Sequence, residues 1–278
     1  MPRPISLLFG VHAHQPVGNF PEVLADAHLR CYKPFLHVLY RYPNFCFAMH
    51  ISGWLLDYLI ERYPADMALL REMVARGQVE LFGAGDTEPV LAAIPNRDRI
   101  GQIQTFSDKL EAKLGRRPQG AWLTERVWEA TVIPALADCG IRYAIVDDYH
   151  FLCTGKTSVE LDGYFTTEED GRVLDLFPIS EALRYRLPFS PAGEVVAYLE
   201  SLALNRTGGV EGADTASADV DRLPGHAEGA GQLGPQGAVH HRGRRLLDHL
   251  LVPALQRALP LAERPDGAVR VGEDLHLD

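Results

Sequence analysis

The stretch "GAWLTERVWEA" (residues 120–130) ends an apolar, β-rich run with two tryptophans, two acids and one arginine. Short apolar runs of this kind recur along the chain and alternate with longer amphipathic stretches. Continuous apolar strands that alternate with helices predict βα units around a parallel sheet, and therefore an α/β fold. The expected strands are residues 5–11, 45–51, 78–84, 120–124, 143–148 and 172–178.

Three helices are expected between these strands, over residues 22–42, 55–77 and 96–115. Pro64 interrupts the second helix, because proline lacks the backbone donor that a helix interior needs. The third helix opens with Asn96, a good helix cap, and closes on a glycine.

Five of the expected strands are followed by side chains that can do chemistry. They are His12 and His14, His50, Asp86 and Glu88, Glu125, and the run from Asp147 to His150. In a β/α barrel the active site is built from several loops at the carboxyl ends of the strands. This pattern favours a barrel over an open doubly wound sheet, and the sequence has no glycine-rich phosphate turn.

The bulk composition is ordinary for a globular protein, with 46% hydrophobic and 23% charged residues among 278. This length fits one large α/β domain or two small ones. The net charge of −10 and a pI near 5.5 argue against a nucleic-acid partner, which would normally meet a basic face. The negative net charge also gives no reason to expect an anionic substrate, so a neutral substrate agrees best with this composition.

The sequence shows no sign of secretion or membrane insertion. The apolar run at residues 5–11 predicts a buried strand, because a signal peptide needs a longer apolar region and a cleavage site. No apolar stretch approaches the length that crosses a bilayer. The four cysteines are scattered without a C-x-x-C pair, which favours reduced thiols. We therefore expect a cytoplasmic protein without a membrane partner; the sequence does not indicate an oligomeric state.

Glu125 stands between two indoles and beside a guanidinium. Indole faces stack on the C–H faces of sugar rings, and Arg126 would hold a neighbouring carboxylate in its ionised form. An ionised glutamate at the bottom of a cleft can attack an anomeric carbon. The alternative is a structural Glu–Arg pair with Trp122 and Trp128 in the core, and composition alone leaves both open.

The segment "HAHQP" (residues 12–16) brings two imidazoles to one side, because alternate side chains of a strand point the same way. His12 and His14 would then line one site. Three uses are open for them: hydrogen bonds to sugar hydroxyls, ligation of a divalent metal, or packing.

Two further segments carry acids. "GAGDTEPVLAAIP" (residues 83–95) contains Asp86 and Glu88, which alternation on an extended segment would place on one side. A solvated loop acid is an equally good interpretation. "VDDYHF" (residues 146–151) combines two acids, a phenol and an imidazole, which would either orient a substrate or cap the following helix.

Four segments in this order, "FGVHAHQPVGNF", "GDTEPVLAAIP", "GAWLTERVWE" and "YAIVDDYHF", resemble glycoside hydrolase family 57. "FPISEALRYRLPF" (residues 177–189) follows at the expected distance. The resemblance covers roughly residues 4–202 and points to the 4-α-glucanotransferase and α-amylase members. It implies a (β/α)7 barrel that acts on α-1,4-glucans with retention of configuration. Glu125 matches the family's nucleophile, which forms a covalent glucosyl intermediate that water or a sugar hydroxyl releases.

The resemblance also implies a set of residues that contact the substrate, an α-glucan or maltooligosaccharide. These residues are His12, His14, Glu88 and Trp122. From the residue types of the segment "VDDYHF" we add Asp148 and His150 to the expected substrate-binding residues. This chemistry requires neither a cofactor nor a metal.

Two departures from the family pattern affect the expected chemistry. The second motif usually carries aromatics before its glutamate, as in "GFYEP", whereas "GDTEP" stands here, which would weaken stacking on the donor sugar. A retaining enzyme also needs a second carboxyl group, about 5–5.5 Å from the nucleophile, as general acid and base. The family supplies it in a "DDGEKFG"-like segment after "YLESL". No such segment follows here, and Asp214 stands at about the right distance without the surrounding residues.

The composition changes where the resemblance stops. Every Phe, Tyr and Trp lies at or before Tyr198, and residues 199–278 contain no Lys and no Ile. We therefore divide the chain into residues 1–204, an incomplete catalytic β/α barrel, and residues 205–278, an irregular tail. A reading-frame shift in a GC-rich gene would produce such a mixture of Ala, Gly, Arg, Pro and His. A divergent, partly disordered tail is the alternative.

Three functions are compatible with these patterns. The first is a retaining α-glucan-active glycosidase or transglycosidase of impaired activity, because general acid–base help is worth about 10²–10⁴-fold per step and the acid/base is unidentified. The second is a metal-dependent hydrolase or deacetylase on a related barrel, with His12, His14 and Asp86 as ligands and Glu125 as base. The third is an inactive remnant that binds glucan.

Overall fold

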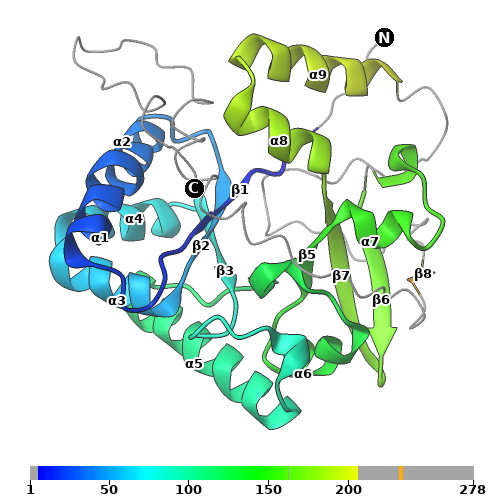
Figure 1. Cartoon of the computed structure of the whole chain (residues 1–278), viewed down its shortest axis with the longest axis horizontal. Helices are drawn as coiled ribbons and strands as arrows, with labels where there is room; N and C mark the ends of the chain where they lie inside the picture. The colour runs from blue at the N-terminus through cyan, green and yellow to red at the C-terminus, as the bar shows by residue number, and fades with distance from the viewer. Residues whose placement is uncertain (1–5, 162, 206–231, 234–278) are drawn as a thin grey trace.

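The computed structural model of the chain describes residues 6–161, 163–205 and 232–233 (Figure 1). One sheet has the strand order β1-β2-β3-β4-β5-β7-β6-β8. Its strands are β1 (Gly10–Ala13), β2 (Phe47–Ile51), β3 (Val79–Gly83), β4 (Gly120–Ala121), β5 (Tyr143–Asp147), β6 (Phe165–Glu169), β7 (Arg172–Ile179) and β8 (Gln232–Leu233). The pairs from β1 to β5, and β5 with β7, are parallel. β6 is antiparallel to β7 and parallel to β8.

Helices connect most of the parallel strands. They are α1 (Pro21–Ala27), α2 (Lys33–Tyr40), α3 (Gly53–Arg62), α4 (Pro64–Ala75), α5 (Asn96–Leu114), α6 (Ile133–Asp138), α7 (Asp148–Leu152), α8 (Glu181–Phe189) and α9 (Ala192–Asn205). A π-helical turn (His28–Tyr32) joins α1 to α2. Short 3₁₀ turns cover Leu91–Ala93, Thr124–Arg126, Ala130–Val132 and Ser158–Leu161. In Figure 1, α1 to α4 lie beside β1 to β3, and α8 packs next to α9.

The α/β class expected from the sequence is confirmed, and each of the six expected strands overlaps a strand of the structure. β6 was missed because its sequence, "FTTEE", is polar and is stabilised mainly by its hairpin with β7. The hairpin turns through Asp170 and Gly171, both with positive φ. Within the described residues the strands form an open series from β1 to β8, so closure into a (β/α)7 barrel stays a prediction.

The helix predictions are correct in place and wrong in detail. The break at Pro64 is confirmed, because α3 ends before this residue and α4 begins with it. Asn96 is the first helical residue of α5 and not its cap, a position that Pro95 occupies. Gly115 ends α5 in the left-handed conformation, at φ 86°, where glycine is favoured. The single helix expected over residues 22–42 is divided by the π-helical turn.

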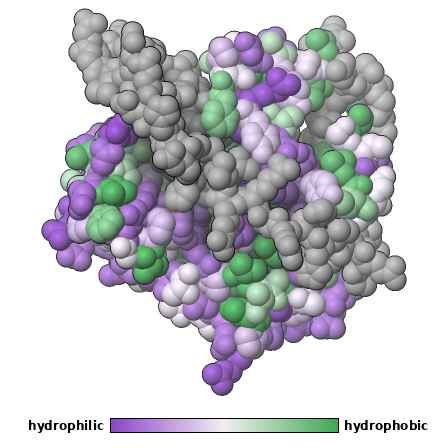
Figure 2. Space-filling model, in the orientation of Figure 1, coloured by the Kyte–Doolittle hydropathy of each residue, from purple (hydrophilic) through white to green (hydrophobic). Residues whose placement is uncertain are grey.

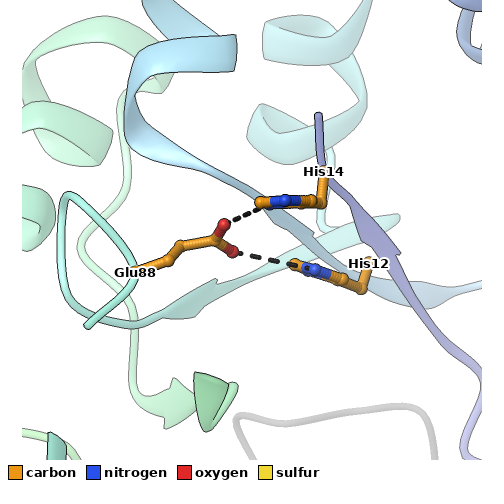
Figure 3. A group of neighbouring side chains, drawn as sticks. All are labelled: His12, His14 and Glu88. Carbon is orange, nitrogen blue, oxygen red and sulfur yellow. Dashed lines mark hydrogen bonds and ion pairs between the residues drawn. The ribbon is translucent and has the colours of Figure 1, made fainter. Parts of the chain in front are cut away.

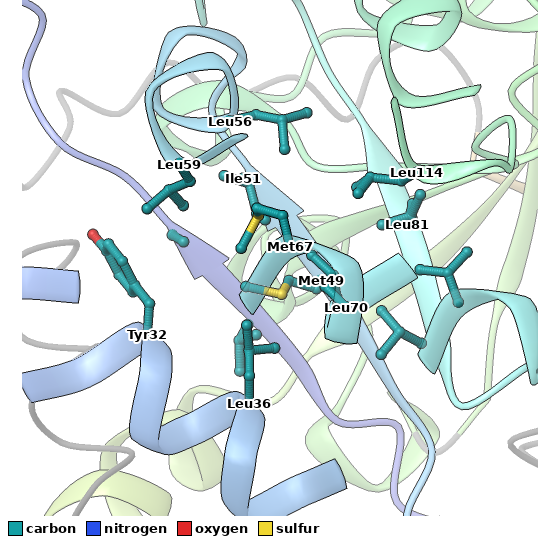
Figure 4. Packing of buried hydrophobic residues seen from close by; sticks show 14 of the residues in the cluster. Tyr32, Leu36, Met49, Ile51, Leu56, Leu59, Met67, Leu70, Leu81 and Leu114 are labelled. Carbon is teal, nitrogen blue, oxygen red and sulfur yellow. The ribbon is translucent and has the colours of Figure 1, made fainter. Parts of the chain in front are cut away.

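The largest hydrophobic cluster packs β1 to β3 against α2, α3 and α4 (Figure 4). Leu36, Leu56 and Leu70 come from these three helices and are fully buried in the same cluster as Met49 of β2. Each buried leucine contributes about 1.5–3 kcal/mol relative to an exposed one. This packing holds β1 and β2 in place, and these two strands carry histidines at their carboxyl ends.

A smaller aromatic layer is formed by Phe82 of β3, Trp122 directly after β4, and Tyr143 of β5. The Tyr143 hydroxyl donates a hydrogen bond to Glu80 Oε1 at 2.5 Å. Gly120 on β4 makes room for the Tyr143 ring, which would overlap any Cβ at that position. The packing of the aromatic layer thus requires glycine at position 120.

On the face shown in Figure 2, apolar residues form separate patches among hydrophilic ones. Within the part of the chain that the structure describes, each helix is too short or too polar to span a bilayer.

Candidate active site at the carboxyl edge of the sheet

The polar residues that follow β1 to β4 reach one edge of the sheet because these strands are parallel. His12 of β1 is the register partner of His50 of β2. Glu88 comes from the loop after β3, and Trp122 directly follows β4. Four consecutive strands therefore contribute to one group of side chains.

Glu88 is the centre of a histidine–carboxylate group with His12 and His14 (Figure 3). Its Oε2 is hydrogen-bonded to His14 Nδ1, and its Oε1 lies 3.7 Å from His12 Nε2. The Glu88 side chain is 8% exposed, that of His12 5% and that of His14 30%. The two histidines point to the same side, as strand alternation predicts.

The loop after β3 turns, and this separates its two acids. The Glu88 N–H donates to the Gly85 carbonyl at 3.0 Å, and Glu88 is left-handed at φ 53°. Asp86 instead lies with its Oδ1 2.7 Å from Lys109 Nζ. The prediction that both acids share one side is therefore wrong, because the segment is not extended. Within the described residues, the acid that lies beside the two histidines is Glu88, whereas Asp86 lies beside Lys109.

His50 lies behind His12 and is fully buried. Their Nδ1 atoms are 2.7 Å apart, so one of them carries the hydrogen of the bond between the rings. Burial lowers the pKa of His50 well below its ordinary value, and the other two histidines lower it further. Burial also lowers the pKa of His12 to about 4, although Glu88 opposes the shift. Both rings are therefore neutral at pH 7.

Trp122 covers the ring of His12 from another side. The two ring centroids are 4.5 Å apart and the planes are nearly parallel, at 11°. The Trp122 backbone N–H donates to the Gly83 carbonyl at 2.8 Å, which continues the pairing of β4 with β3. The indole is thus a support for His12, and its expected contact with a sugar stays a prediction.

Glu125 is presented to solvent at the end of β4. It has φ 56° and ψ 13°, a left-handed conformation, and Arg126 follows in the same region at φ 53°. Such conformations of residues other than glycine cost about 1–3 kcal/mol each and are concentrated at functional sites. The Glu125 side chain is exposed, and within the described residues no hydrogen bond or ion pair engages it. Its carboxylate is therefore available to a ligand.

The neighbours of Glu125 have other partners. Arg126 is buried and donates from Nε to Asp147 Oδ2 at 3.1 Å, while Arg184 Nη1 donates to Asp147 Oδ1 at 3.0 Å. Trp128 is buried in the core cluster between α6 and β5. The ion pair expected between Glu125 and Arg126 is thus not formed in the described part of the chain. Trp128 is not available as a platform for a sugar.

The remaining expected site residues lie farther along the chain. Asp148 begins α7, and its Oδ2 accepts a hydrogen bond from the Glu181 N–H at the start of α8, at 2.9 Å. This is a capping contact, although with a helix other than the expected one. His150 is half-buried on α7. Asp214, the expected general acid/base, lies outside the described residues.

Sequence reasoning assigned no role to His50 or Arg184. His50 was visible as a histidine at a strand end, but its contact with His12 depends on the pairing of β1 with β2. Arg184 lies on α8 and reaches Asp147 of β5, 37 residues away. No local pattern in the sequence signals this contact.

A mostly parallel α/β sheet with histidines and acids gathered at its carboxyl edge defines the class of β/α proteins whose site lies at that edge. Within this class, the chain belongs to glycosyl hydrolase family 57, because the family's sequence model matches residues 8–207.

Two curated relatives share nearly half of the matched residues. The chain is 47% identical over 203 residues to an alpha-amylase of Pyrococcus abyssi, covering 73% of this chain and 31% of the relative. It is 46% identical over 198 residues to a 4-alpha-glucanotransferase of Thermococcus litoralis, covering 71% and 30%. The chain therefore spans about a third of the length of the curated relatives it matches.

Solved structures agree with this assignment. The crystal structure of 4-alpha-glucanotransferase from Thermococcus litoralis superposes with a TM-score of 0.70 at 45% identity, covering 72% of this chain and 31% of that one. A family 57 branching enzyme from Pyrococcus horikoshii has a TM-score of 0.55 at 16% identity, covering 67% and 50%, and shows the fold alone.

Proposed function

We propose that the chain carries the nucleophile half of an α-1,4-glucan-active glycosidase or transglycosidase that retains anomeric configuration. The observation that supports this most directly is Glu125: an exposed carboxylate without a partner in the described residues, held left-handed at the carboxyl end of β4. Family membership and the names alpha-amylase and 4-alpha-glucanotransferase of relatives at about 46–47% identity point the same way.

In the proposed reaction Glu125 attacks the anomeric carbon of the donor glucan. A bond forms between a Glu125 carboxylate oxygen and C1, while the bond between C1 and the leaving oxygen breaks and that oxygen takes a proton from a general acid. The oxygen of water or of a sugar hydroxyl then bonds to C1, the bond between C1 and Glu125 breaks, and the proton of the attacking hydroxyl passes to the group that acted as general acid. Asp214 remains our candidate for the acid/base.

The side chains around Glu88 suit the binding of sugar hydroxyls. Imidazole nitrogens can donate or accept hydrogen bonds, and His14 is more exposed than His12. We assign His12, His14, Glu88 and Trp122 to this role, with Asp148 and His150 at the edge of the site. The acids and histidines would bind a maltooligosaccharide through polar contacts more than through stacking, because Trp122 is already covered by His12.

The test is intact-mass analysis after incubation of the 278-residue chain with α-maltosyl fluoride. Fluoride leaves without acid assistance, so the experiment probes Glu125 whatever the state of the acid/base. We expect a maltosyl adduct that maps to residues 120–130. Glu125→Gln should abolish the adduct and reduce fluoride release by about 10⁴-fold or more.

Glu129→Gln is the matched control, because it removes a second carboxylate from the same segment and should retain the adduct. An adduct that persists in Glu125→Gln would place the nucleophile elsewhere. Neither adduct nor fluoride release from the unchanged chain would refute the proposed enzyme. Maltooligosaccharide binding in that case would favour a glucan-binding remnant.

A further inference from the structure

The histidine–carboxylate group leaves one buried oxygen unsatisfied. Glu88 Oε1 is buried without a hydrogen-bond partner in the described residues. His12 Nε2 and His50 Nδ1 approach it to 3.7 and 3.6 Å, which is too far for a hydrogen bond. A buried carboxylate oxygen is unfavourable unless a donor or cation occupies the space beside it.

The spacing of the three side chains matches that of ligands around a small cation. Each of His12, His14 and Glu88 offers one ligand atom, and these atoms lie within 4.8 Å of one another. Ligands of a tetrahedral zinc ion lie about 2.0–2.2 Å from the metal and hence about 3.4 Å from each other. The three side chains would have to move by roughly an ångström to reach these ligand distances. Figure 3 shows the two rings and the carboxylate facing a common space.

We propose that His12, His14 and Glu88 form a binding site for a divalent transition-metal ion of the zinc class, with one coordination position left open. Two imidazoles and one carboxylate suit zinc, cobalt and nickel better than magnesium or calcium, which prefer oxygen ligands. His50 orients the group, because its contact with His12 Nδ1 turns Nε2 of that ring toward Glu88. The proposal concerns metal binding and not the glycosidase chemistry, which requires no metal. Because the same three side chains are assigned to sugar hydroxyls, a bound ion and a bound sugar would compete for them.

The test is titration of the chelator-treated 278-residue chain with Zn²⁺ by calorimetry, and with Co²⁺ by visible absorption. We expect one ion per chain, and a Co²⁺ spectrum of four- or five-coordinate form. Glu88→Gln and His14→Gln should each weaken binding by about 100-fold or more, above the 10–100-fold typical of an orienting residue. His50→Phe should fall within that 10–100-fold range, because it leaves all three ligands in place.

Two controls identify the site. Asp86→Asn removes the other acid of the same loop, which pairs with Lys109, and should leave binding unchanged. A double variant, His240→Gln with His241→Gln, removes the adjacent histidine pair from outside the described residues and should also bind normally.

Near-UV circular dichroism and the melting temperature would verify that each variant is folded. The proposal is overturned by the absence of Zn²⁺ binding, by unchanged binding in folded Glu88→Gln and His14→Gln, or by its loss in the double variant.

Discussion

At the scale of the residue, backbone conformation decides which side chains meet. Glu88 and Glu125 both have positive φ, and each is turned away from the direction that an extended strand would give it. The resulting strain, about 1–3 kcal/mol per residue, must be offset by packing around these loops. Buried neighbours such as Trp122 and Arg126 provide that packing.

Two glycines provide a test at this scale. Gly120→Ala should lower the free energy of unfolding by about 1–3 kcal/mol or more, because its Cβ would overlap the Tyr143 ring in the aromatic layer. Gly101→Ala, inside α5 with open space around its Cβ position, should raise it by about 0.5–1 kcal/mol. Urea unfolding measures both, and equal effects of the two substitutions would contradict the role assigned to Gly120.

At the scale of the element, one short connecting turn links several helical segments. The π-helical turn between α1 and α2 places His28 in the interior, where its Nε2 lies 2.9 Å from Asp66 Oδ2 of α4. His37 of α2 contacts the other oxygen of Asp66 at 2.7 Å. One carboxylate thereby links three helical segments.

The pH dependence of the free energy of unfolding should report the burial of His28. Burial lowers the pKa of His28 below 6.5; Asp66 opposes the shift, while Lys33 and His37 add to it. The unfolded chain therefore takes up the proton first, and the free energy of unfolding should fall as the pH drops below 6.5, by at most about 1.4 kcal/mol per pH unit from this histidine.

The variant His28→Phe isolates this contribution. It retains an aromatic ring against Tyr63, with which His28 stacks at 3.6 Å, and it removes the titrating group. Urea unfolding between pH 7 and pH 5 should show a shallower loss of stability for the variant than for the unchanged chain. Identical slopes would show that His28 does not titrate between the folded and unfolded states.

At the scale of the whole molecule, two large clusters of buried residues divide the hydrophobic interior. One packs around β1 to β3 and the other around β4 to β7, and the aromatic layer is a separate, smaller cluster. The family match ends at residue 207, close to the point at which aromatic residues cease. Our division of the chain near residue 204 remains a proposal.

The nucleotide sequence of the gene tests the division of the chain near residue 204. If a frame shift explains the tail, one of the other two reading frames downstream of codon 204 should encode aromatic residues and a segment similar to "DDGEKFG". Sequencing the gene and translating all three frames is sufficient. If neither alternative frame encodes such a segment, residues 205–278 are the natural continuation, and the frame-shift explanation is overturned.

Much of this protein could be predicted from sequence because the determining signals are local. Apolar runs, the proline at position 64 and the glycine at 115 define strands and helix ends through short-range sterics. The residue types at the strand ends, such as His12, His14 and Glu125, indicated where the chemistry lies.

Only the tertiary structure decided which of these side chains share a site. The register of β1 with β2 puts His50 against His12, and a turn in the loop after β3 selects Glu88 over Asp86. Arg126 reaches Asp147 and leaves Glu125 exposed. The contacts of Arg126 with Asp147 and of His12 with Glu88 join residues 21 and 76 positions apart. Their geometry is set by packing and cannot be inferred from local pattern.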